Sequence, residues 1–370
     1  MTNMKKGISE LIGKHQEKRE SGINLIASEN HLSGRVREAL ASDLAGRYES
    51  DYYGGSEHAE EIIKRTKELA CELFGVKHAL VKPLSGNVCD LNVMFSFTNP
   101  GNKVAMLPFS GGGYPLGLGK FNRIKVPLPY HDNTYQIDVK RSVKIFMEDD
   151  IPLTILGSSY IPFPHPVEEI SSYIDEYQGG NKLVFDGSHV LGLIATGVFQ
   201  DPLAEGANVL IGSTHKTFYG PQGGVILTNS DDLADRMSQY LEIDLETGIG
   251  LVDNPHVNRI AALGLALEEM MEDKDYGARV VKNSKALAGA LDELGVSMKF
   301  ADRGYSESHQ IFIDEDWDLT GKLCRALDEE GIFIDRTGRI GTAEVTHRGM
   351  KKEDMLEIAQ RISEVYHDLK

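Results

Sequence analysis

The sequence predicts an α/β protein with a layered large domain followed by a smaller α+β domain. Three observations support this prediction. Short apolar runs bounded by Gly, Pro, Asn or Ser alternate with helical patterns up to about residue 255, as expected of strands buried on both faces of a sheet. Beyond that point the pattern changes to long helices. The length of 370 residues also suits roughly two domains.

The charge balance and the cysteines narrow the class of protein. The net charge is −17, which repels nucleic acid and anionic membrane surfaces, so we expect neither as a partner. No apolar run approaches the roughly 20 residues of a membrane span, and the N-terminus lacks a signal-peptide core. The three cysteines show no C-x-x-C spacing. We therefore expect a cytoplasmic protein with no disulfide framework and no metal site.

Six short apolar runs predict the strands of the large domain, and helical patterns lie between them. The predicted strands are His78–Lys82, Lys103–Leu107, Leu153–Leu156, Lys182–Phe185, Asn208–Ile211 and Gly224–Thr228. The predicted helices are Ala59–Phe74, Asn87–Phe97, Val167–Tyr177 and Asp231–Tyr240. Strands that alternate with helices are typical of a mostly parallel sheet.

The C-terminal part begins with two long predicted helices, His256–Glu272 and Gly277–Leu294. After them we expect a strand, a helix, two strands and a last helix, at Gln310–Asp314, Leu319–Glu330, Ile332–Asp335, Ile340–Val345 and from Lys351. The predicted division is an N-terminal arm over 1–40, a large α/β domain over 41–255 and a small α+β domain over 256–370.

The strongest local signal is Ser213-Thr-His-Lys216, which follows a predicted strand and precedes the glycine-rich turn Gly220–Gly224. The carboxyl ends of strands are where α/β sheets bind ligands. A lysine that is partly removed from water there becomes a nucleophilic amine that can trap a carbonyl group. An ordinary surface lysine in a loop is the alternative interpretation.

Two further segments carry polar groups at strand ends. Asp186 ends one predicted strand and His189 follows it, so the carboxylate could pair with a protonated ring nitrogen and the imidazole could support the ring. A helix-capping aspartate with a core histidine is the alternative. Ser85-Gly86-Asn87 follows another strand and begins a helix, which suits a phosphate group, although Ser85 could simply cap the helix.

The amine of Lys216, the carboxylate of Asp186 as partner for a ring nitrogen, and the phosphate site at Ser85-Gly86-Asn87 are together the groups that pyridoxal phosphate requires. With these segments, the motifs Ile26-Ala-Ser-Glu-Asn30, Tyr52-Tyr-Gly-Gly-Ser-Glu57 and Gly341-Thr-Ala-x-x-Thr-x-Arg348 make the chain similar to serine hydroxymethyltransferases over nearly its whole length. The resemblance implies an aspartate-aminotransferase-like, fold-type-I large domain with a mostly parallel central sheet.

The resemblance also implies roles for individual residues. Lys216 would bind the cofactor covalently, Asp186 would face the pyridine nitrogen, and His189 would support the ring. Ser158 would reach the phenolic oxygen, and Ser213 would lie beside the lysine. Arg348 would bind the substrate carboxylate, with Ser28 as a second contact. The phosphate would be held by Ser85, Gly86, Asn87 and His215, of which His215 also counts among the catalytic residues.

Several positions depart from the family pattern. Tyr114 stands where the family has a ring-stacking histidine, and a phenol still stacks but differs in charge. The stretch that carries the family's acid/base glutamate is shortened around Glu49, which is either that glutamate or an unrelated surface acid. Asp253-Asn254-Pro255 replaces Gly-Gly-Pro before the long helix. Tyr53 is retained and serves a partner subunit in the family, which implies a homodimer or a larger homo-oligomer.

We expect serine and glycine to be interconverted with a one-carbon pterin, either tetrahydrofolate or a modified folate. Pterin-independent cleavage of a β-hydroxy amino acid, or a related transaldolase reaction, is the first alternative, because the departures lie where the pterin would bind. Transamination is a further alternative. A catalytically silent binding subunit is disfavoured because Lys216 and Asp186 are both present.

Overall fold

The computed structural model describes residues 7–50, 53–177, 179–244 and 246–370. Its contacts divide the chain into a large unit, Ser28–Arg279, and a small unit, Met1–Ala27 with Val280–Lys370. These bounds differ from the predicted division at both ends. Helix α9 (Val257–Glu272) packs on two helices of the large unit, whereas residues before Ala27 supply a strand to the small one.

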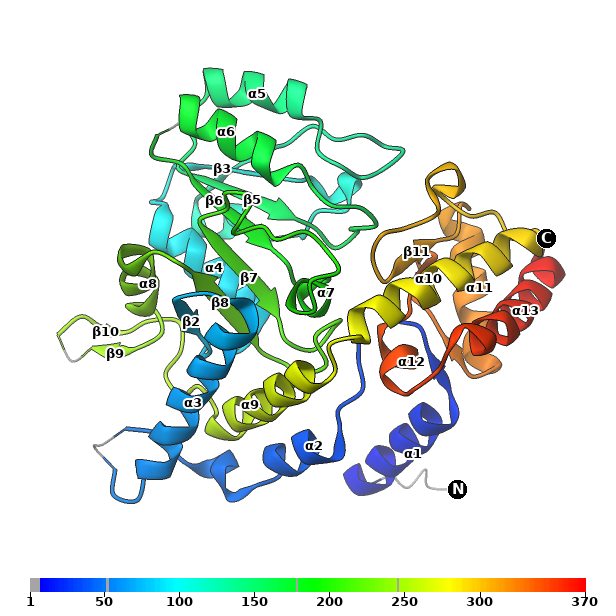
Figure 1. Ribbon diagram of the computed structural model, residues 1–370, viewed down its shortest axis with the longest axis horizontal. Coiled ribbons are helices and arrows are strands. Elements are labelled where there is room, and N and C mark those ends of the chain that lie inside the picture. The colour runs from blue at the N-terminus through cyan, green and yellow to red at the C-terminus, as the bar shows by residue number, and fades with distance from the viewer. Residues whose placement is uncertain (1–6, 51–52, 178, 245) are drawn as a thin grey trace, which may run out of the picture. The chain divides into compact units, whose positions relative to one another are not determined.

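The large unit is built on a seven-stranded sheet with the order β2-β8-β7-β6-β5-β3-β4 (Figure 1). All strands except β8 run in the same direction, so the predicted mostly parallel sheet is confirmed. The strands are β2 (His78–Leu80), β3 (Lys103–Met106), β4 (Ile124–Pro127), β5 (Leu153–Gly157), β6 (Lys182–Asp186), β7 (Val209–Ser213) and β8 (Gly224–Thr228). Every residue of β5, β7 and β8 is buried, as their apolar runs predict.

Helices cover this sheet, and α4 packs on β6, β7 and β8. Helices α5 and α6 lie side by side, as do α3 and α9 (Figure 1). The bounds are α2 (Gly34–Leu40), α3 (Glu57–Phe74), α4 (Gly86–Phe97), α5 (Val139–Glu148), α6 (Val167–Tyr177), α7 (Leu191–Ala195) and α8 (Asp231–Ser238). A short hairpin, β9 (Ile243–Asp244) with β10 (Gly248–Ile249), follows α8. Helix α10 (Tyr276–Glu293) begins in the large unit and ends in the small one.

The small unit joins both ends of the chain. Strand β1 (Ile23–Asn24) pairs in parallel with β12 (Ile332–Phe333), and β11 (Gln310–Phe312) pairs with β13 (Arg339–Gly341) in antiparallel fashion. Its helices are α1 (Ile8–Ser21), α11 (Trp317–Glu329), α12 (Ala343–His347) and α13 (Lys352–Leu369). Leu291, Ile311 and Tyr366 are among the residues of its apolar core.

One predicted strand of the small unit is partly wrong. The structure ends β13 at Gly341 and begins α12 at Ala343, whereas the sequence favoured a strand through Val345. Thr346 donates its hydroxyl to the carbonyl of Thr342 within the helical turn, and Val345 is buried in the core. Packing therefore overrides the strand preference of these β-branched residues.

Candidate active site

Side chains from five parallel strands gather at one edge of the large sheet. Strands β2, β3, β5, β6 and β7 run in the same direction, so the segments that follow them leave at the same edge, which is where such sheets bind ligands. These segments carry most of the predicted site residues. They are Ser85, Gly86 and Asn87 after β2, Tyr114 after β3, Ser158 after β5, Asp186 at the end of β6, and Ser213, His215 and Lys216 at the end of β7.

The loop of Lys216 is fixed by hydrogen bonds on both sides of the lysine. The amide of Asn30 donates to the carbonyl oxygen of Lys216 at 2.6 Å. Ser213 is buried, and its backbone N–H donates to Oγ of Ser188 at 2.9 Å. Lys216 itself is half-buried. The sequence did not single out Asn30 or Ser188 for these contacts, although each lies inside a motif that it did single out.

His215 stands beside the lysine as a neutral imidazole. Burial, together with the nearby charge of Lys216, lowers its pKa to about 4. Its Nδ1 atom is buried and has no hydrogen-bond partner within the described ranges of the chain. A neutral ring with one open nitrogen can accept or donate a hydrogen bond to a bound group.

The N-terminus of α4 forms the predicted anion site. Oγ of Ser85 caps this twelve-residue helix by accepting from the N–H of Val88 at 3.2 Å. A Cβ atom on Gly86 would lie 2.3 Å from Oγ of Ser213, so only glycine allows the helix to approach the lysine loop this closely. The open backbone N–H groups and the positive end of the helix dipole favour an anion such as a phosphate.

Asp186 lies at the sheet edge and is 8% exposed. One of its carboxylate oxygens accepts the backbone N–H of Ser188 at 3.0 Å. The neighbouring strand approaches closely, because a Cβ on Gly157 would lie 2.1 Å from the carbonyl oxygen of Asp186, and Gly157 has φ +91°. His189 follows and is 4% exposed. A carboxylate in this position can pair with a protonated ring nitrogen, the role predicted for it.

Ser158 is oriented by its own loop and by a buried histidine. Its hydroxyl donates to the carbonyl of Tyr160 at 2.6 Å, and Nε2 of His165 lies 3.3 Å from its Oγ. Burial lowers the pKa of His165 to about 4, so this ring is neutral and can donate from Nε2. The backbone N–H of Ser159 also donates to the carbonyl of Gly112 at 2.8 Å, which ties this loop to the one that carries Tyr114.

Tyr114 lies over the start of α4. Its hydroxyl donates to Oδ1 of Asn87 at 3.2 Å. Partial burial raises the pKa of Tyr114, and the nearby carboxyl groups of Asp90 and Asp186 raise it further. The phenol is therefore uncharged at neutral pH and presents an aromatic ring beside the anion site.

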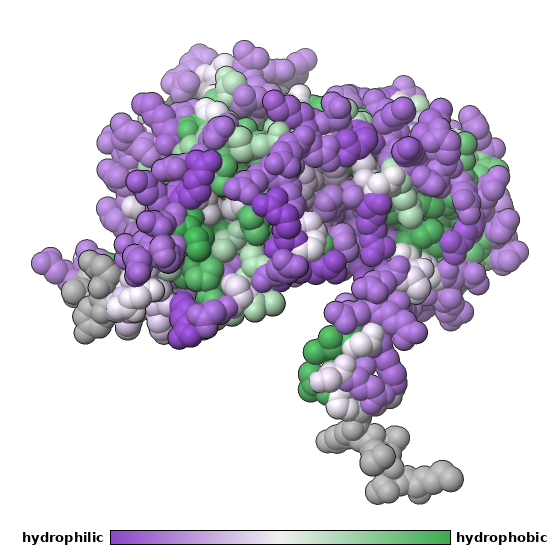
Figure 2. All heavy atoms as spheres, turned by 60° about the horizontal axis from the view of Figure 1, so that its bottom comes forward, coloured by the Kyte–Doolittle hydropathy of each residue, from purple (hydrophilic) through white to green (hydrophobic). Residues whose placement is uncertain are grey.

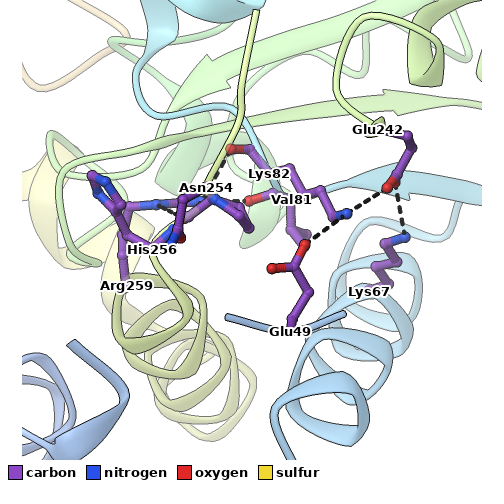
Figure 3. A network of polar contacts seen from close by, with 9 residues as sticks. Glu49, Lys67, Val81, Lys82, Glu242, Asn254, His256 and Arg259 are labelled. Carbon is purple, nitrogen blue, oxygen red and sulfur yellow. Dashed lines mark hydrogen bonds and ion pairs between the residues drawn. The ribbon is translucent and has the colours of Figure 1, made fainter. Parts of the chain in front are cut away.

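Glu49 lies in an ion-pair network rather than alone on the surface (Figure 3). Nζ of Lys82 lies 3.1 Å from Oε1 of Glu49 and also contacts Glu242, which in turn lies 4.0 Å from Nζ of Lys67. These residues line a pocket of about 420 Å³. Lys82 precedes Ser85 by three positions, so the network borders the loop that leads to the anion site.

A buried arginine fastens the same loop from the other side (Figure 3). Nη2 of Arg259 donates to the carbonyl oxygens of Val81 at 2.9 Å and Pro255 at 3.0 Å, with a longer bond to Lys82. Burial lowers the pKa of Arg259 to about 10, so it keeps its charge. Asp253, which replaces a family glycine, is exposed. The sequence indicated no role for Lys82 or Arg259, because most of their partners come from distant elements.

The remaining predicted residues come from segments other than those that follow the strands of the large sheet. Arg348 belongs to the small unit, where its Nε lies 3.4 Å from Glu344 and its Nη1 donates to the carbonyl of Gly22. Ser28 is half-buried at the start of the large unit. Tyr53 is 46% exposed and stacks on Tyr48 with ring centroids 4.9 Å apart. Their roles toward a substrate stay predictions.

Comparison with known proteins agrees with this geometry. The chain matches the serine hydroxymethyltransferase family over residues 1–362. It is 38% identical to serine hydroxymethyltransferase of Methanothermobacter marburgensis, with 98% of this chain and 90% of that protein covered. The corresponding protein of Methanocaldococcus jannaschii is 39% identical, with 96% and 88% covered.

A solved structure shares the fold. The crystal structure of L-threonine transaldolase from Pseudomonas fluorescens superimposes with a TM-score of 0.89 at 27% sequence identity, covering 98% of this chain and 87% of that one. The expected fold-type-I architecture is confirmed by this match. With the family match over nearly the whole sequence, the conclusion is that this chain belongs to the serine hydroxymethyltransferase family.

Proposed function

We propose that this protein transfers a hydroxymethyl group between serine and glycine, with pyridoxal phosphate as cofactor and a one-carbon pterin as carrier. Its family membership, together with an intact lysine and aspartate at one sheet edge, carries the proposal. In this reaction the Cα–Cβ bond of serine breaks, the hydroxymethyl carbon passes to the pterin as a methylene group while its hydroxyl oxygen leaves as water, and Cα takes a proton to give glycine. The carrier would be tetrahydrofolate or a modified folate.

The chain fits this cofactor on structural grounds. Gly86 lets the start of α4 lie against the lysine loop, because a Cβ there would meet Ser213, so the open N–H groups of the helix lie close to that loop. Buried Nδ1 of His215 lacks a partner among the residues that the structure describes, so it is open to a ligand. The cofactor supplies an electron-withdrawing ring that stabilises negative charge at the substrate Cα. Lys216 would hold the cofactor covalently through its side-chain amine.

Other residues would fix the orientation of the ring. Asp186, with Ser188 N–H on one oxygen, would hold a proton at the ring nitrogen. Tyr114 would stack on the ring, and Ser158 would contact its phenolic oxygen, with His165 behind it. The N–H groups at the start of α4 would bind the phosphate. Arg348 would bind the substrate carboxylate with its planar guanidinium, with Ser28 as a second contact.

We assign the proton transfer at the hydroxymethyl group to Glu49, within a homodimer. Its ion pair with Lys82 and its position in a pocket of about 420 Å³ support a functional group rather than a surface acid. Exposed Tyr53 would serve the partner subunit. Helix α1 also supports assembly, because it has no buried residue and carries Ile8, Leu11 and Ile12 on one exposed face (Figure 2). Such a face is typical of an interface between subunits.

A pterin-independent reaction is the second candidate. The structural similarity to an L-threonine transaldolase favours it, as does the shortened sequence around Glu49. In this alternative the same residues would cleave a β-hydroxy amino acid to glycine and an aldehyde, or pass the glycine unit to another aldehyde.

We further propose a cytoplasmic location. Among the described residues, no helix is both long and apolar enough to cross a bilayer.

One titration separates the two candidates. Purified holoprotein is mixed with glycine, serine or allo-threonine, with and without tetrahydrofolate, and the cofactor absorbance and the products are measured. A long-wavelength band with glycine that grows when the folate is added supports hydroxymethyl transfer. Acetaldehyde from allo-threonine, with no folate effect on the glycine spectrum, supports the aldolase instead. Lys216→Ala is the control that should abolish every spectral response.

A further inference from the structure

Asp90 is a buried carboxyl group that the proposed reaction does not use. It lies in α4, one helical turn after Gly86, and is 4% exposed. Residues four positions apart lie on the same face of a helix. Gly86 faces Ser213 and Ser188 at the ends of β7 and β6, and α4 packs on both strands. Asp90 therefore points toward the floor of the candidate site.

The carboxyl group of Asp90 has no hydrogen bond or ion pair with any residue that the structure describes. An isolated charge in such a place is strongly unfavourable, and a buried acid avoids this by keeping its proton. Burial indeed raises the pKa of Asp90 well above its ordinary value, and the charge of Asp186 raises it further, while Lys216 acts in the opposite direction. Both its burial and its pKa shift therefore favour the protonated form of Asp90.

The titratable groups around Asp90 come from each element at this edge. Asp186 ends β6, Lys216 follows β7, Tyr114 follows β3, and Cys89 precedes Asp90 in α4. Asp186 accepts an N–H from Ser188 at 3.0 Å, which stabilises its negative charge. When two carboxyl groups are neighbours, the charge on one disfavours a second charge on the other.

We propose that Asp90 is a positioning residue of this site, held as the uncharged carboxylic acid so that the site floor carries a single negative charge on Asp186. A second charge would lie near the N-terminus of α4, where the phosphate of the cofactor is proposed to bind, and would repel it. The protonation of Asp90 thereby controls how tightly the site holds an anionic cofactor. This inference rests on the proposed cofactor site.

Infrared spectroscopy of the protein without cofactor tests the protonation state of Asp90 directly, because a protonated carboxylic acid absorbs at a different frequency from a carboxylate. The wild type should show an acid band at neutral pH that disappears in Asp90→Asn and persists in the control Asp235→Asn, an exposed acid of α8. A band that Asp90→Asn leaves unchanged overturns the proposal. If Asp90→Asn does not fold, Asp90→Ser and isotope-labelled aspartate in the wild type give the same readout.

Binding of pyridoxal phosphate to the apoprotein tests the consequence. At neutral pH the affinity of Asp90→Asn should stay within about twofold of wild type, since an amide and a neutral acid carry equal charge. As pH rises to the value at which the acid band fades, the wild type should bind about tenfold more weakly than Asp90→Asn. If Asp90→Asn binds pyridoxal phosphate about tenfold more tightly than wild type already at neutral pH, Asp90 is ionised in the wild type and the proposal is wrong. The infrared result does not depend on which reaction the enzyme catalyses, so the two proposals fail separately.

Discussion

Nζ of Lys82 lies 3.1 Å from Oε1 of Glu49, and the two side chains are 12% and 17% exposed. Their ion pair is therefore much less screened by water than a surface pair. Burial lowers the pKa of Lys82, but the hydrogen bond and charge of Glu242 and the charge of Glu49 outweigh it, so the net shift is upward. Lys82 is a permanent cation that fixes the candidate acid/base residue.

Lys82→Met should therefore weaken both folding and turnover. Removing the cation leaves the mostly buried Glu49 without this partner and leaves Glu242 with the more distant Lys67, and we expect a loss of about 1–3 kcal/mol in the free energy of unfolding. Turnover should fall about tenfold if Glu49 loses its orientation. Urea unfolding and steady-state kinetics measure the two effects. Lys64→Met removes an exposed charge from the same pocket wall and should be nearly silent; equal effects from both variants would contradict the assignment.

Removal of Lys216 should abolish the reaction while the protein remains folded. Lys216→Ala lacks the amine that holds the cofactor, so turnover should fall about 10³-fold or more, as for other covalent catalytic groups. The shift in cofactor absorbance on binding should also vanish, whereas circular dichroism should stay as in wild type. Lys182→Ala, at the opposite end of a neighbouring strand, is the matched control. Turnover near the wild-type level in Lys216→Ala would exclude the proposed chemistry.

Gly86→Ala should disrupt the anion site specifically. The added methyl group would lie 2.3 Å from Oγ of Ser213, and relieving such a clash costs about 1–3 kcal/mol. We expect weaker binding of pyridoxal phosphate together with a lower melting temperature. Gly119→Ala has open space around the new methyl group and should change neither quantity. Normal cofactor affinity in Gly86→Ala would mean that the phosphate binds elsewhere.

The buried side chain of His165 predicts how the free energy of unfolding depends on pH. Burial lowers the pKa of His165 to about 4 in the folded protein, below the unfolded value near 6.5. The unfolded chain therefore takes up the proton first, and the stability that His165 contributes above pH ~6.5 is lost as pH falls toward 4, by up to about 1.4 kcal/mol per pH unit. His165→Gln should unfold with a flatter pH dependence over this range. His131→Gln, at an exposed position, should follow the wild type.

The sequence predicted those parts of the fold that depend on local pattern. Strands such as Val209–Ser213 are continuous buried runs, which the pattern of apolar residues reports directly. The edge strand Ile124–Pro127 was missed because only Val126 is buried. Helix Val139–Glu148 was missed as well. It is amphipathic, and it buries little besides Ser142 and Phe146.

The sequence also predicted only those side chains of the candidate site that a local motif identifies. Lys216, Asp186 and Ser85 could be predicted because each follows a strand within a motif. Asp90 and Arg259 could not, since their significance comes from burial among elements far apart in the chain. The sequence does not report whether an aspartate or an arginine is buried or exposed in the folded protein. Only the three-dimensional contacts separate the two.

The pairing of β1 with β12 sets an order of events during synthesis. Ile23 pairs with Ile332, so the N-terminal strand waits for 309 further residues before its partner leaves the ribosome. At about 5–20 residues per second this delay lasts about 15–60 s. The large unit, whose residues end at Arg279, can close its sheet earlier. Throughout the interval Ile23 and Asn24 lack the strand with which they pair, so the small unit completes its fold only after the residues of the large unit have been made.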